Sequence, residues 1–159
     1  MTGVSGVGKS TVVVRLAALG QRAVDLDSPE WSEWVDSSDG GGPSPLEPGK
    51  DWVWREDRVG ELLGEDGDGV LFVSGCAPNM GMFRDRFDGV VLLSVTADVM
   101  AERLVHRTTN AYGKHPEELA RSLESKETVE PLLRATADLE LDGSAPLDEV
   151  VAQIVRLSR

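Results

Sequence analysis

The sequence predicts a three-layer α/β fold, in which a parallel sheet lies between two layers of helices. Two runs, residues 70–73 and 90–95, are apolar almost throughout, as expected of strands buried on both faces. Helical segments alternate with these runs, and this alternation is typical of parallel sheets whose strands are joined by helical crossovers. The 159 residues are enough for a single domain, 1–159, with a sizeable core.

The first half of the chain contains two predicted helices, one strand and one loop. In order, these are a helix over 9–19, a strand over 22–27, a loop over 36–49 and a helix over 51–63. Gly20 ends the first helix, because glycine readily takes the left-handed conformation that follows many helices. The loop is rich in Ser, Asp, Gly and Pro and too poor in apolar residues to pack, so we expect it to be flexible. The second helix is expected because Trp54, Val59 and Leu62 can form one apolar face.

The second half of the chain repeats the alternation of strands and helices. In order, we expect a strand over 70–73, a short helix over 80–87, a strand over 90–95, a helix over 97–107, a polar loop over 108–115, a helix over 116–133, a strand over 139–141 and a helix over 146–157. Pro116 suits the first turn of its helix, and Glu117 and Glu118 are favourably placed at the positive end of the helix dipole.

The composition favours a small-molecule partner. The net charge of −12 disfavours binding to nucleic acid or to anionic membranes, because both need clustered Lys and Arg. No apolar run approaches the ~20 residues that span a bilayer, and we expect no signal peptide. The single cysteine, Cys76, excludes an internal disulfide and agrees with a reducing cytosol. We therefore expect a cytoplasmic protein, a monomer or a homodimer, that acts on a small molecule.

The most specific motif lies at the N-terminus. Residues 3–10, GVSGVGKS, match the phosphate-binding P-loop pattern G-x-x-x-x-G-K-[ST] at every fixed position. The glycines let backbone N–H groups curl around a phosphate chain, Lys9 can reach the β- and γ-phosphates, and the Ser10 hydroxyl can bind Mg²⁺. We expect ATP to be bound by Gly3, Ser5, Gly6, Val7, Gly8, Lys9, Ser10 and Thr11.

The position of this motif affects the predicted sheet. A P-loop follows a strand, but only Met1 and Thr2 precede Gly3. The first strand of the sheet is therefore expected to be truncated. Three explanations are open: the gene starts upstream, another segment fills the position, or the sheet is built without the usual strand.

Two aspartates near the end of the strand over 22–27 are candidates for chemistry. Asp25 and Asp27 are two residues apart, so in a strand both carboxylates face the same side. In an open parallel sheet, ligands bind beyond the carboxyl ends of the strands, where the P-loop, these aspartates and Ser74-Gly75 converge. One carboxylate can hold the water shell of a metal ion, and the other can accept a hydrogen bond from a substrate hydroxyl. The alternative interpretation is a helix N-cap or a solvated strand end.

These features resemble the small P-loop kinases, a group that includes shikimate kinases, gluconate kinases and nucleoside monophosphate kinases. The resemblance rests on the P-loop, on Asp25-Leu26-Asp27 and on the later segment ERLVHR over 102–107, and the order of elements agrees along nearly the whole chain. It implies the fold of P-loop NTPases, with residues 28–64 as the substrate-binding region and 108–116 as a lid.

The resemblance implies roles for residues at the acceptor and metal sites. Asp27 would touch the acceptor hydroxyl and act with Lys9 in catalysis, and Asp25 would lie near Mg²⁺ together with Ser10. Arg55 would bind a carboxylate of the substrate. Gly75, at the end of the third strand, would also approach the substrate.

The resemblance also implies a nucleotide site. Arg103 would stack on adenine, and Arg107 would reach the phosphates and take part in catalysis. Pro146, in the loop over 143–146, would cover the opposite side of the base.

The chain departs from the shikimate kinases in two places. Their lid sequence Arg-Pro-Leu-Leu is absent, and Ser74-Gly75-Cys76 replaces their triple glycine, which disfavours shikimate as the substrate. In addition, no aspartate ends the strand over 70–73, so the usual Walker B carboxylate is missing. Asp25 would have to take over its role at the metal.

Three functions are compatible with these residues. The first is an Mg²⁺-dependent phosphotransferase that moves the γ-phosphate of ATP to a hydroxyl of a small metabolite; Asp27 favours it, because a hydroxyl must lose a proton during attack. The second is a nucleoside monophosphate kinase, whose acceptor phosphate needs no base and prefers arginine, such as Arg55, Arg58 or Arg84. The third is an ATP-binding regulatory or resistance module with weak NTPase activity, suggested by the short N-terminus and the missing Walker B acid.

Overall fold

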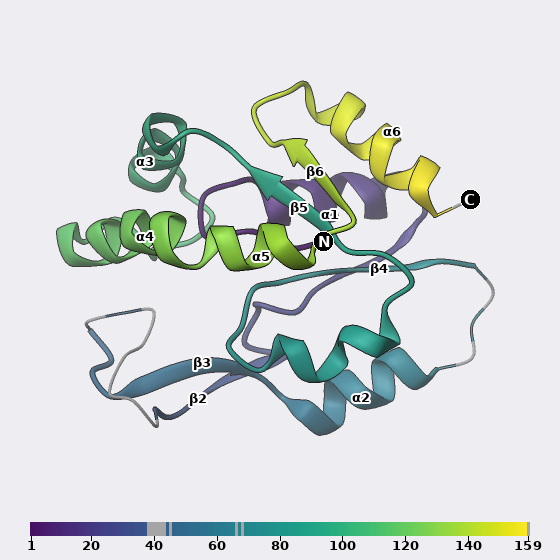
Figure 1. The fold of residues 1–159 in the computed structure, drawn as a ribbon, viewed down its shortest axis with the longest axis horizontal. Helices are drawn as coiled ribbons and strands as arrows, with labels where there is room; N and C mark the ends of the chain where they lie inside the picture. Colours follow the sequence, from purple (N-terminus) through teal and green to yellow (C-terminus); the bar gives the residue numbers. More distant parts are fainter. Residues whose placement is uncertain (38–43, 45, 66, 68, 159) are drawn as a thin grey trace.

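The structure is a computed structural model, which describes residues 1–37, 44, 46–65, 67 and 69–158. Its elements are α1 (Lys9–Ala18), β1 (Arg22–Asp25), β2 (Ser32–Asp36), β3 (Lys50–Trp54), α2 (Glu56–Gly64), β4 (Leu71–Ser74), the 3₁₀ helix η1 (Met80–Arg86), β5 (Val91–Ser94), α3 (Ala97–His106), α4 (Pro116–Thr128), α5 (Glu130–Thr136), β6 (Leu139–Asp142) and α6 (Leu147–Leu157). Helices lie on both sides of the parallel strands, with α1 behind them and α4 and α5 in front (Figure 1). The predicted three-layer α/β fold is confirmed.

The parallel strands form two pairs that the N-terminus joins. β1 pairs with β4, and β5 pairs with β6. Between the pairs, the Met1 amino group donates to the Val73 carbonyl at 2.8 Å, and the Gly75 N–H donates to the Met1 carbonyl at 3.2 Å. On the other side, Thr2 exchanges hydrogen bonds of 2.7 and 2.9 Å with Val91 and Leu93. Met1 and Thr2 therefore lie between the two pairs and join them into one sheet.

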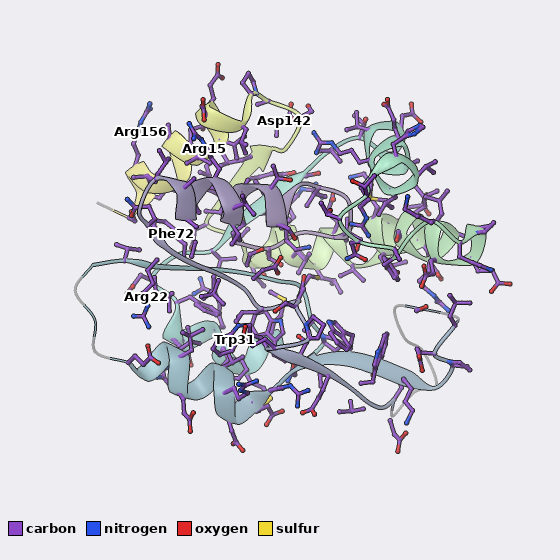
Figure 2. The ribbon with its side chains drawn as sticks, turned by 180° about the vertical axis from the view of Figure 1, so that it is seen from behind. Arg15, Arg22, Trp31, Phe72, Asp142 and Arg156 are labelled. Carbon is purple, nitrogen blue, oxygen red and sulfur yellow. The ribbon has the colours of Figure 1, made fainter. Side chains whose placement is uncertain are left out.

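Two apolar clusters lie on opposite sides of β1 and β4. The first cluster is built around α1, α6, β5 and β6, and Ala23 and Phe72 pack against it. The second cluster is built around α2, Trp54 and Phe83, and it includes Val73 and packs against Val24. Alternate residues of each strand thus face different clusters, as the period of two in a strand requires. Phe72 lies on the α1 side of the sheet (Figure 2).

One predicted helix is wrong over its first turn. Residues 50–54 form strand β3, which pairs antiparallel with β2, so that Trp34 lies opposite Trp52. The helix α2 begins only at Glu56, after the extended residue Arg55. Trp52 and Trp54 share one face at strand spacing, and cross-strand aromatic packing outweighs the helical periodicity that predicted a helix from residue 51. Half of the predicted loop over 36–49 lies outside the described residues, so its predicted flexibility stays a prediction.

The predicted helix over 116–133 is two helices. α4 ends at Thr128, and α5 begins at Glu130 with Pro131 in its first turn. Proline has no N–H group and its ring clashes with the carbonyl four residues earlier, so it ends the first helix and suits the start of the second. None of the helices in the described ranges is long and apolar enough to cross a membrane.

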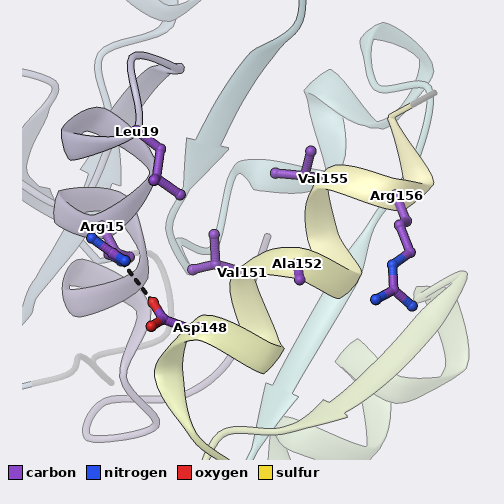
Figure 3. Close-up of a pocket in the computed structure, with 7 residues that line it drawn as sticks. All are labelled: Arg15, Leu19, Asp148, Val151, Ala152, Val155 and Arg156. Carbon is purple, nitrogen blue, oxygen red and sulfur yellow. Dashed lines mark hydrogen bonds and ion pairs between the residues drawn. The ribbon is translucent and has the colours of Figure 1, made fainter.

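A shallow groove separates α1 from α6 on the outer surface. Its lining includes Leu19, Val151 and Val155, and an ion pair of 2.7 Å between Arg15 and Asp148 crosses it (Figure 3). The groove contains none of the predicted site residues. The candidate site lies instead where the P-loop meets the carboxyl ends of the strands.

Candidate active site

The P-loop is shaped by glycines that have no room for a side chain or take a left-handed conformation. Gly6 and Gly8 have φ angles of 87° and 108°. A Cβ on Gly3 would lie 2.5 Å from the Leu93 carbonyl oxygen, so the loop turns tightly over β5. Among the described residues, no acceptor is bonded to the backbone N–H groups of Ser5, Gly6 and Gly8. Unpaired N–H groups at a helix N-terminus form an anion site, so this loop fits a phosphate chain.

Lys9 lies across the loop. Its side chain is only 9% exposed, and its Nζ donates to the Gly3 carbonyl at 2.7 Å. The same Nζ lies 3.5 Å from Oδ2 of Asp27. The ammonium group is therefore shared between the P-loop and the predicted catalytic carboxylate, which puts one positive charge where a transferred phosphoryl group would lie.

Ser10 and Asp25 meet at the start of α1. The Ser10 hydroxyl donates to Oδ2 of Asp25 at 2.6 Å, and Oδ1 of Asp25 accepts from the Asp27 N–H at 3.1 Å. Hydroxyl and carboxylate oxygens suit Mg²⁺, which takes one or two protein ligands and completes its shell with phosphate oxygens and water. The residues that the structure describes contain no group of three or more His, Cys, Asp or Glu side chains that could hold a metal by themselves. These two residues thus fit Mg²⁺ that arrives with a nucleotide.

Asp27 lies just beyond the end of β1, and its side chain is partly buried. Its carboxylate accepts hydrogen bonds from the Cys76 N–H at 2.9 and 3.2 Å and from the Trp54 Nε1–H at 3.4 Å. Burial raises the pKa of Asp27, and the charge of Lys9 and the Cys76 N–H oppose this rise without cancelling it. A carboxylate whose pKa is raised is a stronger base, which suits proton transfer.

Gly75 is required where β4 meets this carboxylate. A Cβ at this position would lie 2.8 Å from Oδ1 of Asp27 and 2.8 Å from the Trp54 ring. The structure therefore brings Gly75 to Asp27, as the sequence predicts. Arg55 follows Trp54, but its Nη1 donates to Glu33 at 2.8 Å, and no described hydrogen bond or ion pair joins it to Asp27.

Arg103 joins two loops at the nucleotide end. Its guanidinium donates to the Val7 carbonyl at 3.1 Å and to the Gly143 carbonyl at 2.9 Å. The loop over 143–146 leads directly into α6, and Pro146 is the residue that precedes this helix. Arg103 therefore links the P-loop to the loop over 143–146, and the predicted placing of Arg103 and Pro146 on opposite sides of the adenine base stays a prediction.

Arg107 faces the predicted lid. Its Nη2 donates to the Tyr112 carbonyl at 2.5 Å, and burial lowers the pKa of its guanidinium. The buried Nε of Arg107 has no partner among the described residues. The lid segment is held further by buried Glu118, whose carboxylate accepts from the Gly113 N–H at 2.9 Å and from the Ser44 hydroxyl at 2.6 Å.

Several residues that contact Asp27 were not predicted from the sequence. Trp54 donates to its carboxylate, the Trp52 Nε1–H donates to its carbonyl at 3.0 Å, and Cys76 contributes a backbone N–H. The alternation of Trp52 and Trp54 is the signal that could have revealed the strand and hence these contacts. The Cys76 contact is made by a backbone N–H group, so the type of residue at that position could not have revealed it.

Known proteins are similar to this chain in sequence pattern and in fold. A family model described as an AAA domain matches residues 1–129. The fold is similar to that of a shikimate kinase from Acinetobacter baumannii in complex with shikimate, at 21% identity and a TM-score of 0.61, over 98% of this chain and 89% of that chain. It is also similar to a gluconokinase from Sinorhizobium meliloti 1021, at 23% identity and a TM-score of 0.54, over 99% of this chain and 90% of that chain. A search of curated proteins found no match.

A third similar structure is a shikimate kinase from Bacteroides thetaiotaomicron, at 19% identity and a TM-score of 0.51, over 98% of this chain and 94% of that chain. At these identities the likeness shows the fold, which is that of the small P-loop kinases, as the sequence predicts. Because the family model matches most of the sequence, this chain belongs to the AAA domain family.

Proposed function

We propose that this protein is a kinase that transfers the γ-phosphate of ATP to a hydroxyl group of a small molecule. The observation that carries this proposal is the distance of 3.5 Å between Lys9 of the P-loop and Asp27. A phosphate-binding group and a carboxylate able to accept a proton are thereby held at one point.

The donor end would be held by the P-loop and its neighbours. The N–H groups of Ser5, Gly6 and Gly8 would bind phosphate oxygens, and Lys9 would leave the Gly3 carbonyl for the β- and γ-phosphates. Ser10 and Asp25 would hold Mg²⁺. When bound, the ion would neutralise part of the negative charge of the phosphates.

The nucleotide would extend from this loop toward α6. Arg103 and the loop ending at Pro146 would enclose the base, and Arg107 would turn from the lid segment over 108–116 to the phosphates. The buried Nε of Arg107, which bonds to no residue that the structure describes, supports this change of partner.

The acceptor would enter beside Asp27. As the acceptor oxygen forms a bond to the γ-phosphorus, its proton passes to the Asp27 carboxylate, and the bond between the phosphorus and the β,γ-bridging oxygen breaks to release ADP. Arg55 and Gly75 would border the acceptor, with the Trp54 and Cys76 N–H groups holding Asp27 in position. Phosphoryl transfer depends mainly on positioning and charge stabilisation, and this arrangement supplies both.

The arginines that would favour a nucleoside monophosphate acceptor are already engaged. Arg55 pairs with Glu33, and Arg84 pairs with Asp138 at 3.3 Å. Arg58 lies over the Trp31 ring, with 5.7 Å between its Cζ and the ring centroid. These contacts favour a hydroxyl acceptor over a phosphate acceptor.

A screen of ADP release tests this proposal. The protein is incubated with Mg²⁺, ATP and a panel of sugars, other hydroxyl metabolites, nucleosides and nucleotides. We expect at least one hydroxyl compound to raise ADP release, and Asp27→Asn to remove that increase, while Asp57→Asn on the exposed surface of α2 keeps it. Stimulation by nucleoside monophosphates alone, or by no compound, contradicts the proposal.

A further inference from the structure

Ser74 carries a buried hydroxyl that the proposed mechanism does not use. This residue ends β4 and has no exposed surface. Its Oγ has no hydrogen-bond partner among the described residues. An unsatisfied hydroxyl in a buried position destabilises the fold, and a ligand that bonds to this hydroxyl would remove the cost.

The strand register places Ser74 beside the metal site. Ser74 lies opposite Asp25 in the parallel pair of β1 and β4, and the Leu26 N–H donates to the Ser74 carbonyl at 2.7 Å. Neighbouring strands are separated by about 4.8 Å, so these two side chains are adjacent when they share a face.

Both side chains lie on the face of the sheet that α1 covers. Phe72 packs against the α1 cluster, and Ser74 follows it by two residues on the same face. Ala23 likewise packs against that cluster, and Asp25 follows it by two residues. The bond from Ser10 at the start of α1 to Asp25 confirms this direction. Ser74 is therefore next to Asp25 and beneath the N-terminus of α1.

We propose that the Ser74 hydroxyl is a positioning group for the metal: it binds a water molecule of the Mg²⁺ shell when Mg²⁺ and ATP bind. This proposal rests on the proposed function. A neutral hydroxyl replaces the carboxylate that usually ends this strand, and Asp25 supplies the negative charge from the neighbouring strand. Ser74 Oγ then lacks a hydrogen-bond partner among the described residues because its partner is a water molecule bound to the metal and not a protein group.

Binding measurements on Ser74→Ala test this proposal without reference to phosphoryl transfer. The affinity for ATP is measured by titration calorimetry with Mg²⁺ and again with EDTA. We expect the alanine variant to bind Mg²⁺·ATP about fivefold more weakly, as for the loss of one hydrogen bond, and metal-free ATP as the wild type does. The melting temperature of the ligand-free protein should rise by roughly 2–6 °C, because an unsatisfied buried hydroxyl is removed.

Ser94→Ala is the matched control at the end of β5. The Ser94 hydroxyl donates to Glu130 at 2.9 Å, so its removal should lower the melting temperature and leave the affinity for Mg²⁺·ATP unchanged. If Ser74→Ala instead lowers the melting temperature and keeps the wild-type affinity for Mg²⁺·ATP, the hydroxyl is structural and the proposal fails. It also fails if the wild type binds ATP equally well with and without Mg²⁺.

These outcomes are separate from those of the proposed function. A wild type that binds Mg²⁺·ATP but phosphorylates no acceptor contradicts the kinase function and leaves the role of Ser74 intact. A wild type that phosphorylates an acceptor while Ser74→Ala binds Mg²⁺·ATP normally contradicts only the role of Ser74.

Discussion

Asp27→Asn separates the chemistry of this side chain from its packing. Asparagine keeps an oxygen that can accept from the Cys76 N–H, now at 2.9 Å, and from the Trp54 indole. It loses the ability to accept a proton and the negative charge 3.5 Å from Lys9. Removal of a general base costs about 10²–10⁴-fold in rate, and we expect a fall of this size in kcat with the best acceptor.

The assay is coupled ADP release, with ATP affinity measured separately by calorimetry. Because the substitution leaves the P-loop and Lys9 unchanged, the affinity for ATP should stay within about a factor of ten of the wild type. A kcat within tenfold of the wild type refutes the role of Asp27 as the base. A loss of ATP binding that accounts for the whole fall in activity refutes it as well.

The same variant gives a prediction for stability against pH. Burial raises the pKa of Asp27 in the folded protein, so the protonated carboxyl favours folding. That contribution is present below the unfolded pKa of about 3.9 and is lost as the pH rises through the folded pKa. Asparagine does not titrate, so the free energy of unfolding of the wild type, relative to Asp27→Asn, should fall as the pH rises above about 4. A difference that is constant with pH, from denaturant titrations, contradicts the raised pKa.

Three further predictions concern the packing around Asp27, the nucleotide and the metal. Gly75→Ala places a Cβ 2.8 Å from the Asp27 carboxylate and should lower the free energy of unfolding by about 1–3 kcal/mol in denaturant titrations. The control Gly60→Ala, in open space on α2, should raise it by about 0.5–1 kcal/mol, and equal effects of the two variants would be inconsistent with the packing. Arg103→Ala should weaken ATP binding by about tenfold in calorimetry, equivalent to about 1.4 kcal/mol, whereas Arg156→Ala on the outer groove should not. Removal of Mg²⁺ with EDTA should abolish acceptor-dependent ADP release, and an excess of Mg²⁺ should restore it; activity that survives chelation argues against the metal site.

The arrangement of the P-loop with Ser10 and Asp25 could be predicted from the sequence because it depends mainly on local pattern. The P-loop glycines, Lys9 and Ser10 lie in one short segment, so their spacing alone brings them together. Asp25 reaches this segment because α1 packs on β1 and brings Ser10 to its carboxylate. The contacts of Gly75 with Asp27 follow from the shared carboxyl edge of the strands.

The acceptor end is less predictable because its contacts are non-local. Residues 51–54 fit a helical face as well as a strand face, and only the pairing of Trp34 with Trp52 decides between them. Arg107 has the spacing of a phosphate-binding residue, but its partner in this structure is the Tyr112 carbonyl, which depends on the path of the lid segment. The partner of Arg55, Glu33, likewise comes from a strand that the sequence did not reveal.

The chemical identity of the phosphorylated product tests the central claim most directly. After reaction with ATP, Mg²⁺ and the best compound from the screen, ³¹P nuclear magnetic resonance distinguishes a phosphate monoester, a phosphoanhydride and inorganic phosphate. The arrangement of Lys9 and Asp27 predicts a phosphate monoester formed in equal amount to ADP, and its absence with Asp27→Asn. Inorganic phosphate as the sole product, or a new phosphoanhydride, contradicts transfer to a hydroxyl at this site.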